Sequence, residues 1–387
     1  MSGARRLVIV GGGPGGLAAA RAYRDQGGDG EVTLLTGEPD APYMRPSLSK
    51  DFLRGESDAA GIALEEDGWF AEHEVTLRRN SPVEALDTGA RTVTLAGGET
   101  VGYDACVLAT GSEPMRLQVP GADDPRVRTI RSLGDARSLR EHAEDAYSAV
   151  VVGSGFIGCE AAASLAMRGL CVTLISDERV PHAARLGVEA GNRIAHWLVE
   201  HGVALRLSVP VEAIEPGLVR VPGKEPVQAD LVVLAAGVRP RSALAEAAGL
   251  ELEEDRVTTD EHMRSSADAV YAVGDLALAR NATAGRALKV EHWGEALKHG
   301  EVAGITAAGG EAAWDAAPGF WSTIGDRTLK HVAWGDGFDE ARLVHHPDGA
   351  FTVWYGSKGT AVGVLTHECD GDYERGRELI EGEQPLP

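Results

Sequence analysis

Two glycine fingerprints of the form G-x-G-x-x-G, at residues 11–16 and 153–158, constrain the fold of this chain more than any other feature. A single copy of the pattern is weak support for a fold, because glycine is common in turns and the chain contains 49 glycines. Each copy, however, stands between an apolar run and a helical pattern, and this context occurs twice.

The first fingerprint follows the apolar residues 7–10, continues into an Ala-rich helical stretch at 17–26 and leads to a second apolar run at 32–35. The second has the same surroundings, at residues 149–152, in a helix up to Arg168, and at 172–175. In such units the glycines allow a tight turn and close packing, and a pyrophosphate rests on the amino end of the helix. We therefore expect two dinucleotide sites, the alternative being two ordinary tight turns.

Charge and composition exclude several classes of function. The net charge of −22 opposes binding to nucleic acids and to anionic membranes, both of which need a positive field. Because the sequence shows no apolar signal region and no membrane-length apolar run, we expect a cytoplasmic location and no membrane partner. The four cysteines are widely spaced and indicate neither a disulfide framework nor a metal site.

Three later segments end an apolar run at a turn. These turns are Ala109-Thr110-Gly111 after residues 103–108, Ala236-Gly237 after 229–235, and Gly274-Asp275 after 270–273. Open parallel sheets bind ligands at the carboxyl ends of their strands, so the turns are candidate ligand contacts. For Asp275 a helix N-cap is the alternative, and both roles are compatible.

The last part of the chain has a different pattern. From Pro318 onward, short alternating runs are separated by turns rich in Gly, Asp and Pro, which predicts an antiparallel sheet. Residues 372–381 predict a closing helix. With 387 residues the chain is long enough for two or three domains.

Taken in order, these features resemble the pyridine nucleotide-disulfide oxidoreductase superfamily over nearly the whole chain. The resemblance implies an α/β fold with two Rossmann-like domains, one for FAD and one, inserted in the first, for NAD(P)H. A C-terminal α+β domain with an antiparallel sheet would follow. We expect the FAD domain at residues 1–113 and 242–316, the NAD(P)H domain at 114–241 and the C-terminal domain at 317–387.

Residues 42–50, Pro-Tyr-Met-Arg-Pro-Ser-Leu-Ser-Lys, indicate the branch of the superfamily. Disulfide reductases carry a Cys-x4-Cys pair in this region, whereas this segment has no cysteine. It resembles the FAD-dependent ferredoxin and rubredoxin reductases of the putidaredoxin reductase type. Monodehydroascorbate reductase and apoptosis-inducing factor are close relatives by the same segment.

The resemblance implies roles for three residues around the flavin. Arg45 would lie against the FAD phosphates, Lys50 near the flavin N5, and Glu160 beside Lys50 as its partner. A cation near N5 favours the reduced, anionic flavin, and a lysine held in a cofactor pocket needs a carboxylate to offset its desolvation. Lys50 and Glu160 are therefore the candidate catalytic residues. For Lys50 alone, a solvated loop lysine is the alternative.

The resemblance extends to further cofactor contacts. Residues 290–293 resemble the segment whose backbone meets the flavin pyrimidine ring, with Trp293 either beside the ring or buried in the core. The residues expected to bind the two cofactors are Gly11, Gly13, Pro14, Gly16, Glu38, Arg45, Lys50, Val83, Ala109, Thr110, Gly111, Gly153, Gly155, Phe156, Ile157, Gly158, Glu160, Asp177, Arg179, Arg185, Ala236, Gly237, Gly274, Asp275, Glu291, His292, Trp293 and Trp321.

The choice between NADH and NADPH is left open by the residues after the second strand of the second unit. Ser176 stands where an NAD site usually has an acid that bonds the ribose. Asp177 could still serve the ribose, and Arg179 or Arg185 could meet a 2′-phosphate. Asp177 and its acidic neighbour Glu178 would repel that phosphate, which favours NADH.

Together the resemblance implies a flavoprotein that takes a hydride from NAD(P)H onto FAD and passes single electrons to a [2Fe-2S] ferredoxin or a rubredoxin. Thr323-Ile324 replaces the Asp-Gln that usually follows Phe320-Trp321-Ser322 in relatives, which leaves the acceptor open. The acidic chain would also repel an acidic ferredoxin unless basic residues cluster locally. The alternatives are a monodehydroascorbate- or quinone-type reductase and an interaction protein like apoptosis-inducing factor. Monomer and homodimer are both compatible with the sequence.

Overall fold

The computed structural model describes residues 5–66 and 68–387, and the chain divides into two compact units. Unit 1 comprises residues 1–44, 63–113 and 239–320, and unit 2 comprises residues 45–62, 114–238 and 321–387. Each unit therefore combines three separate stretches of sequence. Within the described part of the chain, no helix is long and apolar enough to cross a membrane.

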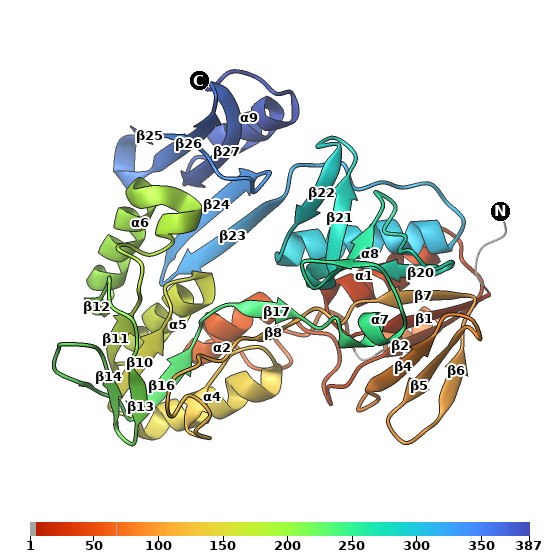
Figure 1. The fold of residues 1–387 in the computed structure, drawn as a ribbon, viewed down its shortest axis with the longest axis horizontal. Coiled ribbons are helices and arrows are strands. Elements are labelled where there is room, and N and C mark those ends of the chain that lie inside the picture. The colour runs from red at the N-terminus through yellow and green to blue at the C-terminus, as the bar shows by residue number, and fades with distance from the viewer. Residues whose placement is uncertain (1–4, 67) are drawn as a thin grey trace. The chain divides into compact units, whose positions relative to one another are not determined.

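Unit 1 is organised around a parallel sheet of order β20-β7-β1-β2-β3 (Figure 1). Its strands are β1 (Arg6–Val10), β2 (Glu31–Leu35), β3 (Val75–Arg78), β7 (Ala105–Leu108) and β20 (Val270–Ala272). Residues 7–10 and 105–108 are buried throughout, as expected for inner strands of a parallel sheet. The first fingerprint follows β1 directly and so lies at the carboxyl edge of this sheet.

Helices α1 (Pro14–Asp25) and α8 (Trp293–Ala307) of unit 1 pack backbone against backbone. A Cβ atom on Gly300 would lie 2.1 Å from the carbonyl oxygen of Gly15, and one on Gly304 would lie 2.3 Å from that of Ala19. Atoms in proteins do not approach so closely, so both positions in α8 require glycine. This contact holds the fingerprint helix α1 in place.

Two smaller sheets complete unit 1. One contains β4 (Val83–Asp87), β5 (Thr92–Leu95) and β6 (Thr100–Gly102), and the other β18 (Leu252–Glu253), β19 (Arg256–Thr259), β21 (Ala277–Asn281) and β22 (Arg286–Lys289). The short helices of the unit are α3 (Trp69–Glu72), α7 (Ala243–Ala247) and η2 (Gly274–Leu276). At the borders of the units, β8 (Ser112–Pro114) pairs with β17 (Val238–Pro240).

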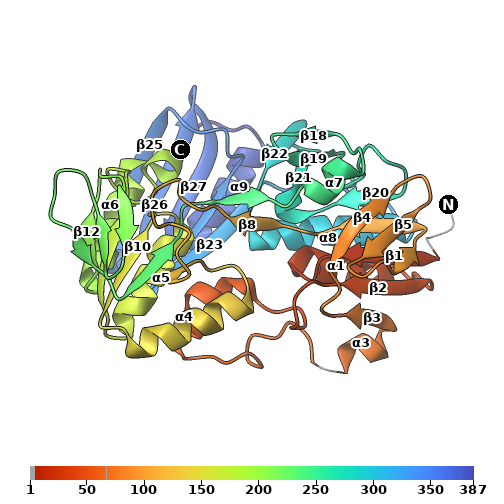
Figure 2. The ribbon, with the colours of Figure 1, turned by 60° about the horizontal axis from the view of Figure 1, so that its bottom comes forward.

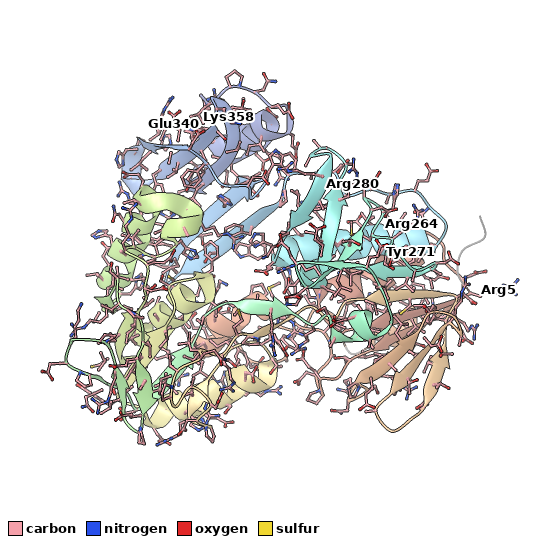
Figure 3. All side chains as sticks on the ribbon, viewed as in Figure 1. Arg5, Arg264, Tyr271, Arg280, Glu340 and Lys358 are labelled. Carbon is pink, nitrogen blue, oxygen red and sulfur yellow. The ribbon has the colours of Figure 1, made fainter. Side chains whose placement is uncertain are left out.

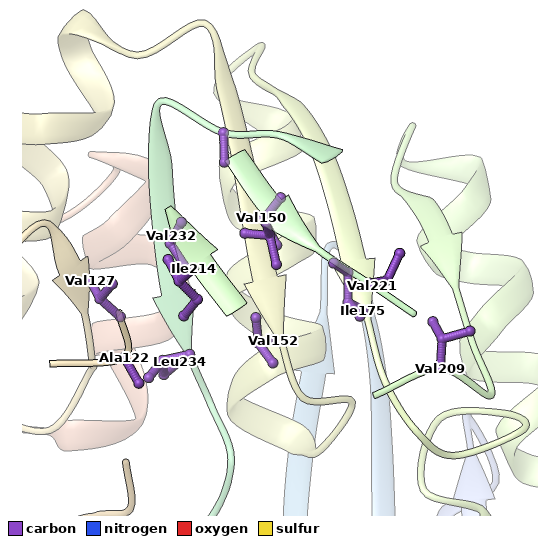
Figure 4. Close-up of a cluster of buried hydrophobic side chains, with 12 residues drawn as sticks. Ala122, Val127, Val150, Val152, Ile175, Val209, Ile214, Val221, Val232 and Leu234 are labelled. Atoms are coloured by element: carbon purple, nitrogen blue, oxygen red, sulfur yellow. The ribbon is translucent and has the colours of Figure 1, made fainter. Parts of the chain in front are cut away.

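Unit 2 contains a second parallel sheet, of order β12-β11-β10-β16-β9. Its strands are β9 (Val127–Arg128), β10 (Ser148–Val152), β11 (Cys171–Ile175), β12 (Ala204–Arg206) and β16 (Leu231–Leu234). Figure 4 shows how Val150, Val152 and Ile175 of this sheet gather with Ile214 and Val221 in one buried apolar cluster. Ile214 belongs to a three-stranded sheet formed by β13 (Ala213–Glu215), β14 (Leu218–Arg220) and β15 (Val227–Gln228).

The carboxyl-terminal part of unit 2 forms a sheet of order β23-β24-β27-β26-β25, antiparallel where β24, β27, β26 and β25 pair. Its strands are β23 (Gly319–Ile324), β24 (Arg327–Ala333), β25 (Glu340–His345), β26 (Phe351–Ser357) and β27 (Thr360–His367), with η3 (Pro347–Gly349) before β26 and α9 (Asp370–Glu381) after β27. The other helices of the unit are η1 (Arg45–Ser49), α2 (Asp51–Arg54), α4 (Leu133–Asp145), α5 (Phe156–Met167) and α6 (Ala183–Glu200). Helix α4 lies beside α2 (Figures 1 and 2).

The expected fold class is confirmed, with two parallel sheets that each carry a fingerprint at the end of one strand and a final antiparallel sheet. The grouping into two units differs from the three expected domains in two respects. Residues 45–62 belong to unit 2, and residues 114–238 form one unit with 321–387. The division into FAD, NAD(P)H and C-terminal domains stays a prediction about cofactor binding.

Candidate functional site

The first fingerprint makes a turn that only glycine fits. Gly11 has φ +122°, and a Cβ there would lie 2.2 Å from the carbonyl oxygen of Ala109 at the end of β7. A Cβ on Gly16 would lie 2.0 Å from the carbonyl oxygen of Gly11. The turn is therefore pressed against both the neighbouring strand and its own helix.

The amino end of α1 is open to a ligand. Gly13 is the N-cap, Pro14 is the first helical residue, and no described side chain caps the helix. A Cβ on Gly13 would meet no described atom within 4 Å. Free amide groups and the positive end of the helix dipole therefore face an uncrowded space, which fits a pyrophosphate.

An acidic group stands at the end of the neighbouring strand β2. The backbone nitrogen of Glu38 donates to Thr36 Oγ1 (3.1 Å), and Tyr43 Oη donates to Glu38 Oε2 (2.6 Å). These bonds fix a carboxylate beyond the carboxyl end of β2, where an acid can bond ribose hydroxyls. Val83 begins β4 and is partly buried.

The turns after β7 and β20 bring further polar groups to the same sheet edge. Thr110 Oγ1 donates to the carbonyl oxygen of Arg241 (2.9 Å), and Gly111 and Gly274 both have positive φ. Ser112 Oγ donates to the Asp275 carboxylate. Asp275 is the second residue of helix η2 and not its N-cap, a position held by Val273.

His299 of α8 supports this turn from the core. The backbone nitrogen of Gly274 donates to His299 Nδ1 (3.3 Å), and burial lowers the pKa of His299 to about 3. The unfolded chain therefore binds a proton between about pH 6.5 and 3 that the folded chain does not, so stability falls as the pH decreases.

We expect the His299→Asn variant, which keeps an acceptor but does not titrate, to show a weaker loss of stability in acid. The slope of unfolding free energy against pH should decrease by up to about 1.4 kcal/mol per pH unit between pH 6 and 4. Urea unfolding at several pH values measures this slope. An unchanged slope would contradict the assignment of a buried neutral imidazole.

At the start of α8 the predicted residues use their side chains within the protein. Glu291 forms an ion pair with the buried Arg256. His292 is the N-cap of α8 and stacks on Phe320, with 4.3 Å between ring centroids. Trp293 is partly buried. The Glu291 carboxylate is thus engaged with Arg256, and cofactor binding by these three residues stays a prediction.

In unit 2, Glu160 is the centre of a buried hydrogen-bond group. Its Oε2 atom accepts from Lys50 Nζ (2.8 Å) and Ser49 Oγ (2.6 Å), and its Oε1 atom accepts from Ser322 Oγ (2.6 Å). The side chain of Glu160 is 5% exposed and that of Lys50 is 12% exposed. Lys50 Nζ also donates to the carbonyl oxygen of Pro46 (2.9 Å).

The predicted pairing of Lys50 with Glu160 is therefore present, while the contacts from Ser49 and Ser322 were not predicted. Arg45 donates to the carbonyl oxygen of Arg131 (2.8 Å). Trp321, next to Ser322 on β23, is 42% exposed.

The second fingerprint repeats the geometry of the first. Gly153 has φ +107°, and a Cβ there would lie 2.3 Å from the carbonyl oxygen of Ala235. A Cβ on Gly158 would lie 2.1 Å from that of Gly153. Gly155 is the N-cap of α5, without a capping side chain and without a described atom within 4 Å of a Cβ. Unit 2 thus also presents an open helix end.

The remaining predicted residues of unit 2 come from three separate places along the chain. Phe156 is partly buried and Ile157 is exposed at the start of α5, and Ala236 and Gly237 follow β16. The guanidinium carbon of Arg185 lies 5.6 Å from the Phe156 ring centroid.

The acid in contact with the second fingerprint is Glu178, and the role of Asp177 at the ribose stays a prediction. Asp177 and Arg179 are exposed, whereas the Glu178 carboxylate accepts from Ser154 Oγ (3.1 Å). The sequence presented both acids side by side, and only the loop conformation separates their roles.

Sequence comparison assigns the chain to a family. Residues 5–300 match the family described as pyridine nucleotide-disulphide oxidoreductase, and the chain belongs to that family. It is an NAD(P)H-dependent flavoprotein oxidoreductase whose cofactors are FAD and NAD(P)H.

The chain is similar to named reductases over most of its length. It is 31% identical to rhodocoxin reductase of Rhodococcus erythropolis, covering 98% of this chain and 90% of that protein. It is 32% identical to rubredoxin-NAD(+) reductase of Pseudomonas putida, covering 84% and 85%. Among solved structures, the covalent putidaredoxin reductase–putidaredoxin complex matches with a TM-score of 0.92 and 27% identity, covering 98% of this chain and 94% of that one.

Proposed function

We propose that this protein carries electrons from NAD(P)H through FAD to a small iron–sulfur carrier protein, a [2Fe-2S] ferredoxin or a rubredoxin. The observation that carries the proposal is the Lys50–Glu160 pair beside a segment without cysteine. Relatives that are 31–32% identical to this chain are named as reductases of rhodocoxin, rubredoxin and ferredoxin. We further propose a cytoplasmic location.

The thiols of the chain support electron transfer to a carrier over disulfide reduction. Cys106 and Cys159 are fully buried, and burial raises the pKa of Cys106 to about 12 and that of Cys159 further above its ordinary value. Because the thiolate is the reactive form, neither is suited to attack a disulfide. Cys171 lies at the amino end of β11, beside Ser148 at the start of β10 and so at the sheet edge opposite the second fingerprint, and Cys369 is the N-cap of α9.

The two open helix ends support the assignment of the cofactors. In the proposal, the backbone of residues 11–16, Glu38, the turn at 109–111 and Asp275 hold FAD, and residues 153–158 hold NAD(P)H. When bound, FAD supplies the group that accepts two electrons together and releases them singly. Lys50 then provides a positive charge whose position is fixed by Glu160, and Arg45 provides a second cation for the FAD phosphates.

Charge on the surface shapes the choice of carrier. In unit 1 the exposed arginines Arg264 and Arg280 each lie 3.6 Å from a carboxylate, that of Asp260 and that of Glu261 respectively (Figure 3). Such paired arginines contribute little net positive field toward an acidic carrier. We therefore expect productive docking to depend on apolar and hydrogen-bonding contacts and to survive moderate salt.

The proposal is tested by cytochrome c reduction with NADH, with and without a [2Fe-2S] ferredoxin as intermediary. We expect at least a tenfold rise in rate on adding ferredoxin, largely retained when salt is raised. No rise, with fast turnover of quinones, would instead favour a small-molecule reductase. No rise, with a charge-transfer complex that lasts for minutes after NADH addition, would favour an interaction protein.

A further inference from the structure

The end of strand β11 carries a ring of hydrogen bonds that the fingerprint itself does not require. The backbone nitrogen of Glu178 lies 3.2 Å from Ser176 Oγ, the two hydroxyls of Ser176 and Ser154 are 2.7 Å apart, and Ser154 Oγ lies 3.1 Å from Glu178 Oε2. Both serines are buried, at 5% and 3% exposure. The ring therefore joins the second fingerprint to the loop after β11.

The chemistry of the groups fixes the direction of these bonds. The amide of Glu178 can only donate and its carboxylate can only accept, so Ser176 must accept from the amide and Ser154 must donate to the carboxylate. Ser176 then donates to Ser154. Hydrogen bonds that run in one direction around a ring strengthen one another, so the carboxylate is held firmly.

The other carboxylate oxygen of Glu178 is also oriented. Oε1 accepts from the backbone nitrogen of Ala184 at 3.0 Å, near the start of α6. Each carboxylate oxygen has further capacity to accept. Glu178 therefore keeps acceptor sites for a ligand while its position is set from two sides.

From this ring we propose that Glu178 bonds the adenosine ribose hydroxyls of the pyridine nucleotide and makes this site selective for NADH over NADPH. The inference rests on the proposed NAD(P)H site of unit 2. An acid beyond the second strand is the usual ribose contact in a Rossmann unit, but here the strand-end position is Ser176. Ser176 uses its hydroxyl within the hydrogen-bond ring, and the ribose contact is made by Glu178, two residues later.

The 2′-phosphate of NADPH would meet an ionised carboxylate at this position and be repelled. The hydrogen-bond ring further predicts that Ser154 affects the selectivity for NADH although it does not itself contact the nucleotide. Ser154 is therefore a positioning residue, acting through Glu178.

The test is calorimetric binding of NAD⁺ and NADP⁺ to the FAD-loaded protein. We expect the native protein to bind NAD⁺ at least tenfold more tightly. Glu178→Gln, which keeps the shape and removes the charge, should reduce that ratio at least tenfold, and Ser154→Ala should reduce it by a smaller factor. Glu189→Gln removes an exposed acid of α6 as a matched control and should leave the ratio unchanged.

The inference would be overturned if the native protein bound NAD⁺ and NADP⁺ equally tightly, or if Glu178→Gln left the affinity ratio unchanged. It would also be overturned if Asp177→Asn lowered the affinity ratio and Glu178→Gln did not. Flavin absorbance and melting temperature verify that each variant is folded. The outcome is independent of the electron acceptor. If the protein fails to reduce ferredoxin but the variants change the affinity ratio, the proposed carrier is wrong and the inference about Glu178 stands. If the protein reduces ferredoxin but the affinity ratio does not change, the proposed carrier stands and the inference is wrong.

Discussion

The Glu160→Ala variant is expected to unfold with a free energy about 3–5 kcal/mol below that of the native protein, because removing one partner of a buried ion pair leaves the other charge unpaired. Lys50 would lose its carboxylate partner in a site where only 12% of its side chain is exposed. The hydroxyls of Ser49 and Ser322 would lose their acceptor as well. Glu160→Gln, which retains an acceptor oxygen, should lose less.

Urea unfolding followed by circular dichroism measures this loss. The matched control is Glu215→Ala in the same unit, because Glu215 pairs with Arg220 at the surface, where the two side chains are 42% and 45% exposed. Exposed pairs contribute about 0–1 kcal/mol, so the control should change little. Equal losses in the two variants would show that burial does not govern the Glu160 group.

Gly300→Ala is the second variant with a large expected effect. The added methyl group would lie 2.1 Å from the carbonyl oxygen of Gly15, so α8 and α1 would have to separate. Overpacking a core lowers the free energy of unfolding by about 1–3 kcal/mol and sometimes more. Because the clash here is with rigid backbone, we expect a loss of about 3 kcal/mol or more. Since α1 carries the first fingerprint, we also expect a lower FAD content in the purified protein.

Gly294→Ala is the control on the same helix. A Cβ at Gly294 would lie 3.8 Å from its nearest neighbour, the carbonyl oxygen of Gly319, which is ordinary contact. Alanine is a better helix former than glycine by about 0.5–1 kcal/mol, so this variant should be neutral or slightly more stable. Thermal unfolding and the ratio of flavin to protein absorbance compare the two. Similar stability and flavin content in both would contradict the close packing.

The fingerprints and their strands were predictable because their signals are local. An apolar run, a glycine turn and a helix lie within some thirty residues, and each step follows from backbone sterics. The pairing of Lys50 with Glu160 was different, since 110 positions separate them. Only the resemblance to a family brought these two residues together before the structure did.

The details of the site depended on contacts that no local pattern carries. Ser322 reaches Glu160 from a strand 162 positions away, and nothing in its own neighbourhood indicates a buried partner. The choice between Asp177 and Glu178 depends on how one loop turns after β11. Likewise the carboxylate of Glu291 pairs with Arg256 of strand β19, which lies 35 positions earlier in the chain.

The distance in sequence between Glu160 and Ser322 also has a consequence for synthesis of the protein on the ribosome. At about 5–20 residues per second, a span of 162 residues takes roughly 8–32 seconds to translate. During that interval Glu160 and Ser49 have already been made, but the Glu160 carboxylate still lacks the hydroxyl of Ser322. The hydrogen-bond group around Glu160 is therefore incomplete in the nascent chain until β23, the first strand of the carboxyl-terminal sheet, has been made.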